Sequence, residues 1–144
     1  AEQTFQKAIE LKSNYSPAHY QLALLYDQQG RLNDAIGKME SVAKYNMKDV
    51  GVAFQLGQLY IRRNGEDDLV RAKNALSYAV SLAPSFSNAR WFLASVYEQE
   101  GDTDAAIEQV KKVLELNPDN VMVKSRLDRL QSGKLSSSVP EVIE

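Results

Sequence analysis

A leucine that recurs at a nearly fixed interval most constrains how this chain of 144 residues can fold. Leu22 and Leu56 are 34 residues apart, Leu56 and Leu93 are 37 apart, and Leu93 and Leu127 are again 34 apart. A self-similar period of about 20 to 50 residues is typical of proteins that stack one small structural unit on the next. The spacing therefore predicts an array rather than a single irregular core.

Each unit of the array contains two amphipathic runs. Apolar residues recur at intervals of three and four in both runs, which is the period of a helix with one buried face. The equivalent apolar positions are Leu22, Ala23, Tyr26, Ala35, Met39 and Val42, then Leu56, Gly57, Tyr60, Ala72, Leu76 and Ala79, then Leu93, Ala94, Tyr97, Ala106, Val110 and Val113. Gly30 and Gly101 interrupt two of the units between their runs. The pattern predicts helical hairpins.

The two ends of the chain each carry one helix instead of two. Residues 1–15 have the apolar pattern of a second helix, with Phe5 and Ile9 on its apolar side, and no first helix before it. Residues 121–131 have the pattern of a first helix with a charged face, which is expected of a solvated end cap and consists of Lys124, Arg126, Asp128 and Arg129. Residues 132–144 show no helical period and are predicted to be an extended tail.

These units resemble the tetratricopeptide repeat, whose signature has an aromatic, Leu-Gly, Tyr, and later Ala, Phe and Pro over 34 residues. Leu56-Gly57 and Tyr60 match it directly, whereas His19, Ala53 and Arg90 stand where the signature has its aromatic. The resemblance implies an all-α, right-handed solenoid of stacked antiparallel helix pairs. Its full repeats would be residues 16–49, 50–86 and 87–120, flanked by the half-repeat 1–15 and the capping helix 121–131.

Such solenoids usually bind an extended peptide or a partner helix in the groove lined by the first helix of each pair. In this sequence the resemblance places these residues in the groove: Tyr20, Leu24, Asp27, Phe54, Gln58, Ile61, Arg62, Trp91, Ser95 and Glu98. The alternative is that the aromatic rings pack between neighbouring helices. Some family members hold acidic peptide ends in a clamp of cationic and amide side chains. The corresponding positions here carry no cationic residue, so the resemblance implies a more apolar ligand.

Catalytic and cofactor chemistry is not expected. His19 is the single histidine, there is no cysteine, and the glycines are isolated at turns, so the sequence predicts no catalytic residue, cofactor site or metal site. Glu98, Glu100, Asp102 and Asp104 are close in sequence, but they lack the calcium-loop pattern and are predicted to be a solvated turn.

The charge and hydropathy patterns exclude other classes of partner. The 17 basic and 19 acidic residues are scattered along the chain, which does not favour nucleic-acid binding. No apolar run approaches the roughly 18 residues of a membrane span, so a soluble domain without direct membrane insertion is expected. The compartment is left open.

Taken together, these patterns predict a non-catalytic scaffold that binds a protein or peptide. The alternative is a soluble accessory domain of a larger enzyme, which could be a membrane enzyme. Complementary half-repeats also suggest head-to-tail assembly or docking of the tail, since such contacts build rings or filaments. The residues assigned to this assembly are Phe5, Ile9, Val123, Leu127, Leu130, Val139, Val142 and Ile143.

Overall fold

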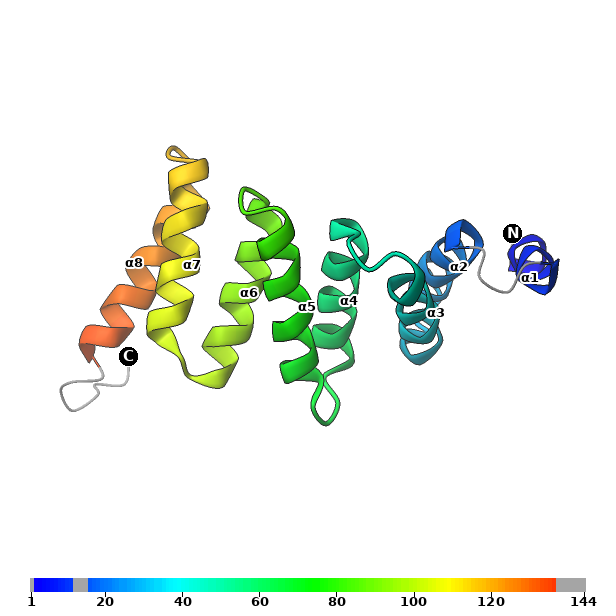
Figure 1. Cartoon of the computed structure of the whole chain (residues 1–144). Helices are drawn as coiled ribbons and strands as arrows, with labels where there is room; N and C mark the ends of the chain where they lie inside the picture. Colours follow the sequence, from blue (N-terminus) through cyan, green and yellow to red (C-terminus); the bar gives the residue numbers. More distant parts are fainter. Residues whose placement is uncertain (1, 12–15, 137–144) are drawn as a thin grey trace. The chain divides into compact units, whose positions relative to one another are not determined.

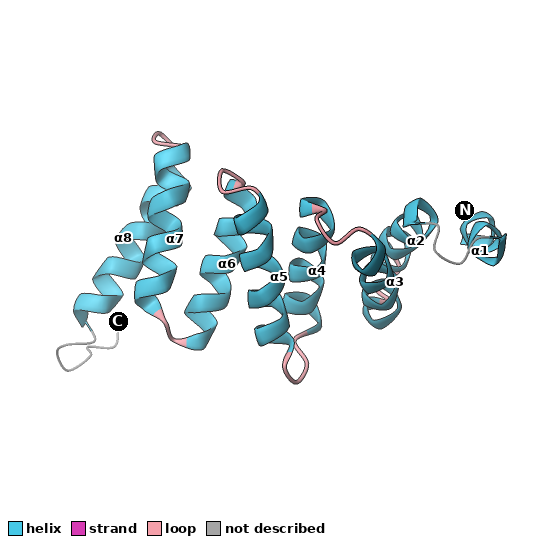
Figure 2. Ribbon diagram, in the orientation of Figure 1, coloured by secondary structure: helices cyan, strands magenta, loops and turns pink. Residues whose placement is uncertain are grey.

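The computed structural model describes residues 2–11 and 16–136, and within those ranges all regular secondary structure is helical (Figures 1 and 2). The helices are α1 (Glu2–Leu11), α2 (Ser16–Gln28), α3 (Leu32–Tyr45), α4 (Val50–Arg63), α5 (Asp68–Leu82), α6 (Ser87–Glu100), α7 (Thr103–Leu116) and α8 (Val121–Ser136). Most of the helix ends lie within one or two residues of the positions that the glycines, prolines and apolar period predict.

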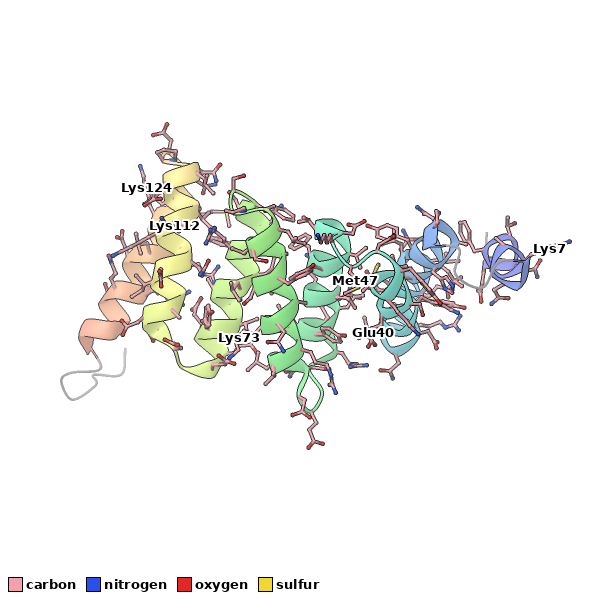
Figure 3. All side chains as sticks on the ribbon, viewed as in Figure 1. Lys7, Glu40, Met47, Lys73, Lys112 and Lys124 are labelled. Atoms are coloured by element: carbon pink, nitrogen blue, oxygen red, sulfur yellow. The ribbon has the colours of Figure 1, made fainter. Side chains whose placement is uncertain are left out.

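The helices form two compact units. Unit 1 spans residues 1–83 and holds α1 to α5, and unit 2 spans residues 84–144 and holds α6 to α8. Within unit 1 each helix packs against the next one in sequence, and within unit 2 α7 packs against both α6 and α8. Lys112 lies on α7 and Lys124 on α8, both in unit 2 (Figure 3).

The core of each unit consists of the apolar positions that repeat in the sequence. Of the eighteen repeated positions, all except Tyr97, which is half-buried, are buried. Gly57 on α4 shows how tightly α4 packs against α5. A Cβ atom added at Gly57 would lie 2.5 Å from Cγ of Leu76 on α5. Because real Cβ atoms do not approach other atoms so closely, glycine at this position allows α4 and α5 to pack together.

The turns use residues suited to a left-handed backbone. Gly30 and Gly101 end α2 and α6 with φ values of 75° and 81°. The backbone N–H of Asp102 then donates to the carbonyl of Tyr97 at 2.9 Å, which satisfies a carbonyl left free at the helix end. The Asp102 carboxylate in turn accepts from the backbone N–H of Ala105 at 3.1 Å and caps α7.

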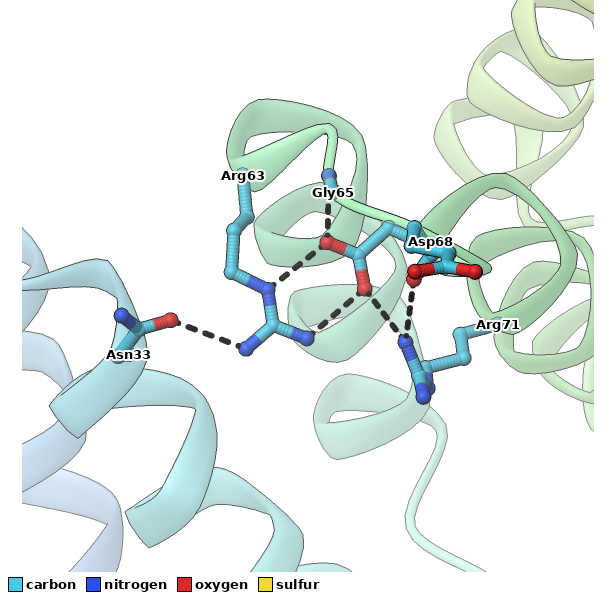
Figure 4. Close-up of polar contacts among 6 residues, drawn as sticks. Asn33, Arg63, Gly65, Asp68 and Arg71 are labelled. Atoms are coloured by element: carbon cyan, nitrogen blue, oxygen red, sulfur yellow. Dashed lines mark hydrogen bonds and ion pairs between the residues drawn. The ribbon is translucent and has the colours of Figure 1, made fainter.

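The longer turn between α4 and α5 is held by a buried carboxylate (Figure 4). Asp68 has a relative exposure of 1% and accepts hydrogen bonds from Arg63 Nε and Nη2, both at 2.8 Å. It also accepts from the backbone N–H of Gly65 at 2.9 Å and from Arg71 Nη1 at 3.0 Å. The hydrogen bonds from Arg63 are the main reason why the pKa of Asp68 is lowered, and those from Gly65 and Arg71 add to it against the effect of burial. The turn that lengthens this repeat to 37 residues, three more than its neighbours, is therefore fixed in place.

The last helix differs from its prediction in one respect. Residues 132–144 were expected to be an extended tail, but α8 continues to Ser136, so the prediction is wrong for residues 132–136. The chain contains no proline between Pro118 and Pro140, and one glycine inside a helix costs only about 1 kcal/mol. Residues 137–144, including Val139, Val142 and Ile143, lie outside the described residues.

Candidate functional site

Two facing rows of side chains on α6 and α8 form the candidate site of unit 2. Trp91, Ser95 and Glu98 follow one another along α6 at intervals of four and three residues, so they lie on one face of the helix. The row on α8 has the same helical spacing and consists of Met122, Ser125, Arg126 and Arg129. With Val121 and Gln99, the two rows line a hollow of about 700 Å³.

Arg126 covers Trp91. Its guanidinium carbon lies 4.3 Å from the centroid of the Trp91 ring, which is the geometry of a cation–π contact. Arg126 Nη1 also donates to the Trp91 carbonyl at 3.0 Å, and Nη2 donates to Ser95 Oγ at 2.9 Å. The side chain is only 10% exposed. The expectation that Arg126 belongs to a solvent-facing cap is therefore wrong, because its guanidinium finds both an aromatic face and acceptors on α6.

Glu98 connects both arginines of the site. Its Oε2 accepts from Arg126 Nε at 3.0 Å and Nη2 at 2.5 Å, and its Oε1 accepts from Arg129 Nη2 at 2.9 Å. Burial acts to raise the pKa of Glu98, but the hydrogen bonds from Arg126 and Arg129 together lower the pKa below its usual range. Glu98 is therefore held as a carboxylate.

The opposite end of the hollow is apolar and open. Met122 and Val121 are 71% and 72% exposed, which is unusual for side chains of their size. Met122 and Trp91 also border a second, smaller hollow of about 280 Å³ that reaches the turn at Asn117. Trp91 itself is half-buried and packs against the core of unit 2, so it contributes to the fold as well as to the wall of the site.

In unit 1, the predicted groove residues lie on α2 and α4. Asp27 and Arg62 form an ion pair that joins the two helices. Five of the predicted groove residues in unit 1 are half-buried: Tyr20, Leu24, Phe54, Gln58 and Ile61. Tyr20 also lines a hollow of about 290 Å³ with Pro17, Val42 and Asn46. Half-burial is compatible with both a groove and a packing role, so the assignment of these residues stays a prediction.

Three of the eight residues predicted to mediate end-to-end assembly, Val123, Leu127 and Leu130, are covered within unit 2. Val123 and Leu130 are buried in the core of unit 2, and Leu127 packs against the same cluster. Phe5 is half-buried on α1, whereas the side chain of Ile9 lies outside the described part of the structure. The exposed residues of α8 include the charged Lys124 and Asp128 as well as the apolar Val121 and Met122.

Across residues 2–11 and 16–136, no group of three histidine, cysteine or acidic side chains is arranged to hold a metal ion. His19 is buried in α2, and Asp102 caps α7 as predicted for a solvated turn. None of the described helices combines the length and apolarity needed to span a membrane.

Sequence reasoning identified the α6 half of the site and missed the α8 half. Trp91, Ser95 and Glu98 were predicted from their repeat positions, but Val121, Met122, Ser125, Arg126 and Arg129 were not. A signal was present, since Met122, Arg126 and Arg129 stand at i, i+4 and i+7 on one helical face. The sequence alone does not show whether a charged residue in that row faces solvent or lines a groove, because this depends on its contacts.

Paired helices repeating about every 34 residues, with a hollow between successive first helices, define an α-helical repeat protein. Two family models, both described as tetratricopeptide repeat, match residues 4–37 and 63–130. The chain belongs to the tetratricopeptide repeat family, a class of protein-binding helical repeats.

Solved structures show the same fold. A crystal structure of MamA superposes with a TM-score of 0.84 at 22% identity, covering 92% of this chain and 76% of MamA. YrrB, described as a tetratricopeptide repeat protein with an unusual peptide-binding site, gives 0.81 at 22% identity and covers 92% of this chain and 67% of YrrB. The first such domain of Spaghetti (RPAP3), bound to the HSP90 peptide SRMEEVD, gives 0.76 at 18% identity, covering 84% and 94%. The predicted all-helical solenoid class is confirmed.

One curated relative extends over nearly the whole chain. The human protein O-mannosyl-transferase TMTC3 is 27% identical over 143 residues, which are 99% of this chain. The chain spans only 15% of the length of that protein.

Proposed function

We propose that this chain is a non-catalytic interaction module that binds a peptide segment of another protein, with the hollow between α6 and α8 as its main contact surface. The observation that carries the proposal is the exposed apolar pair Val121 and Met122, which lines a preformed hollow. Exposed apolar side chains grouped around a concave surface are typical of interaction sites. Peptide binding by the structural neighbours YrrB and Spaghetti supports the same class of ligand.

The site is suited to binding because its wall is fixed before a ligand arrives. Arg126 makes four hydrogen bonds to α6 as well as its contact with Trp91, so α8 cannot shift without breaking them. A preorganised surface loses less conformational entropy on binding than a mobile one. The proposal assigns no catalytic role to any residue.

Selection from a random dodecapeptide phage library on the immobilised chain tests this function. Enriched peptides, synthesised and titrated by fluorescence anisotropy, should bind about tenfold more weakly to Met122→Ala, which corresponds to about 1.4 kcal/mol. Val70→Ala is the matched control, since Val70 is an exposed aliphatic residue on α5 and lies outside the hollow. Failure to enrich any peptide, or equal effects of both substitutions, would argue against this surface as the binding site.

A second function is favoured by the similarity to TMTC3, which covers the full repeat array. In this alternative the chain is the repeat region of a larger transferase and positions a protein for an enzymatic part elsewhere. Sequencing the coding region around this segment distinguishes the two. An adjoining transferase domain supports the alternative, and a reading frame confined to the repeats contradicts it.

End-to-end assembly is not part of the proposal, because Val123 and Leu130 are already buried inside unit 2. Light scattering over a range of concentrations tests this choice. A constant monomeric mass is expected, whereas a mass that rises with concentration would show that the chain self-associates.

A further inference from the structure

The charge of the hollow narrows the kind of peptide that it can accept. Arg126 and Arg129 contribute two positive charges and Glu98 contributes one negative charge, so the three side chains carry a net charge of +1. Outside this trio, the residues that line the hollow are uncharged. A ligand with an acidic side chain would therefore complement the site, whereas a basic ligand would meet an excess of positive charge.

Of the two arginines, Arg129 is the one that can reach a ligand. Arg126 is 10% exposed and already donates to Glu98, Ser95 and the Trp91 backbone. Arg129 is 63% exposed and, among the described residues, donates one hydrogen bond, to Glu98 Oε1. A pair this exposed typically contributes only about 0 to 1 kcal/mol, so the guanidinium can turn toward an incoming carboxylate at little cost.

Met122, an apolar residue of the hollow, lies at a fixed distance from Arg129 along α8. Met122 and Arg129 are seven residues apart on one face of α8, which places them roughly 10 Å apart along the helix at about 1.5 Å per residue. In an extended polyproline-like segment, residues three apart share one side and are about 9 Å apart. The two anchors of such a ligand would match the two ends of the hollow.

We propose that the hollow between α6 and α8 binds an extended segment of a partner protein in which an acidic residue stands about three positions from an aliphatic one. The carboxylate pairs with Arg129, and the aliphatic side chain packs on Met122 and Val121. This specificity rests on the proposed peptide-binding function and adds its chemistry. It differs from the more apolar ligand that the family resemblance implies, because the cationic residues of the hollow lie on α8 and not at the positions of the family's clamp. One internal acidic side chain is sufficient, since Arg126 remains bound to Glu98.

Peptides enriched from the random dodecapeptide library on the full chain test the proposal. They should share an Asp or Glu three residues from Leu, Ile, Val or Met. Synthetic versions with the acid replaced by its amide should bind about tenfold more weakly, as should the wild-type peptide to Arg129→Gln. Combining the amide peptide with Arg129→Gln should cause little further loss, because both changes remove the same contact.

Lys124→Gln is the matched control, since Lys124 is an exposed cation on α8 that does not line the hollow, and this variant should bind as wild type. If peptides bind and Met122→Ala weakens them, but the amide peptide and Arg129→Gln have no effect, the acidic specificity is refuted and the proposed function stands. If no enriched peptide depends on Met122, the proposed function itself fails.

Discussion

The buried carboxylate of Asp68 gives the most direct test of how unit 1 is held together. Replacing Asp68 by Asn preserves the shape of the side chain but removes its charge and turns an acceptor into a donor that faces Arg63 and Arg71. Asp68 is 1% exposed and accepts four hydrogen bonds. The substitution should therefore be among the most destabilising single changes at any polar residue of this unit.

The size of the loss in unfolding free energy depends on how deeply Asp68 and its two arginine partners are buried. Removing one member of a buried ion pair typically costs about 3 to 5 kcal/mol. The side chains of Arg63 and Arg71 are 28% and 47% exposed, so both can recover some hydration after the carboxylate is neutralised. We therefore expect a loss near the lower end, about 3 kcal/mol, which is a large part of the roughly 5 to 15 kcal/mol that stabilises a typical domain.

Urea denaturation followed by circular dichroism at 222 nm measures this loss. At about 1 to 3 kcal/mol per molar urea, the midpoint should fall by about 1 to 3 M. Asp67→Asn is the matched control, because Asp67 is exposed, its side chain makes no capping hydrogen bond, and its φ of 63° suits asparagine. A loss below about 1 kcal/mol for Asp68→Asn, or equal losses for the two variants, would refute the argument that this carboxylate holds the turn.

Three further perturbations follow from the same structure. Gly57→Ala should cost about 1 to 3 kcal/mol by overpacking against Leu76, and adding Leu76→Val should recover part of the loss; an unchanged urea midpoint in the single variant would contradict the close contact. Gly101→Ala should cost about 1 kcal/mol because its φ is 81°, as measured by thermal melting; an equal or higher melting temperature would contradict this. Because the pKa values of Asp68 and Glu98 are both lowered in the folded state, their stabilisation is fully present above the unfolded value of about 4 and is lost as the pH falls through the folded values. The melting temperature should therefore drop on acidification from pH 4 toward 2, and a constant value over that interval would show that neither carboxylate stabilises the fold.

Most of the fold was predictable because the period of the apolar residues and the positions of the helix-breaking residues agree in the sequence. The recurrence of Leu22, Leu56 and Leu93 defines the period, and Gly30 and Gly101 mark turns that only a left-handed backbone can make. The Asp68 network was not predictable, since a polar insertion most simply indicates an exposed turn. What fixes it is a set of hydrogen bonds from Arg63, Gly65 and Arg71, which depend on side-chain directions and not on periodicity.

The same limit applies to the last helix, with consequences for function. A helix that ends an array and carries charges is expected to face water, and Lys124 and Asp128 do so. Arg126 does not, because the face of α6 offers it Trp91, Ser95 and Glu98 together. Through these contacts of Arg126, α8 forms the second wall of the hollow and not only a solvated cap. Residues 121–136 therefore belong to the candidate binding surface, and a chain cut before them would lose Met122 and both arginines while keeping all three full repeats.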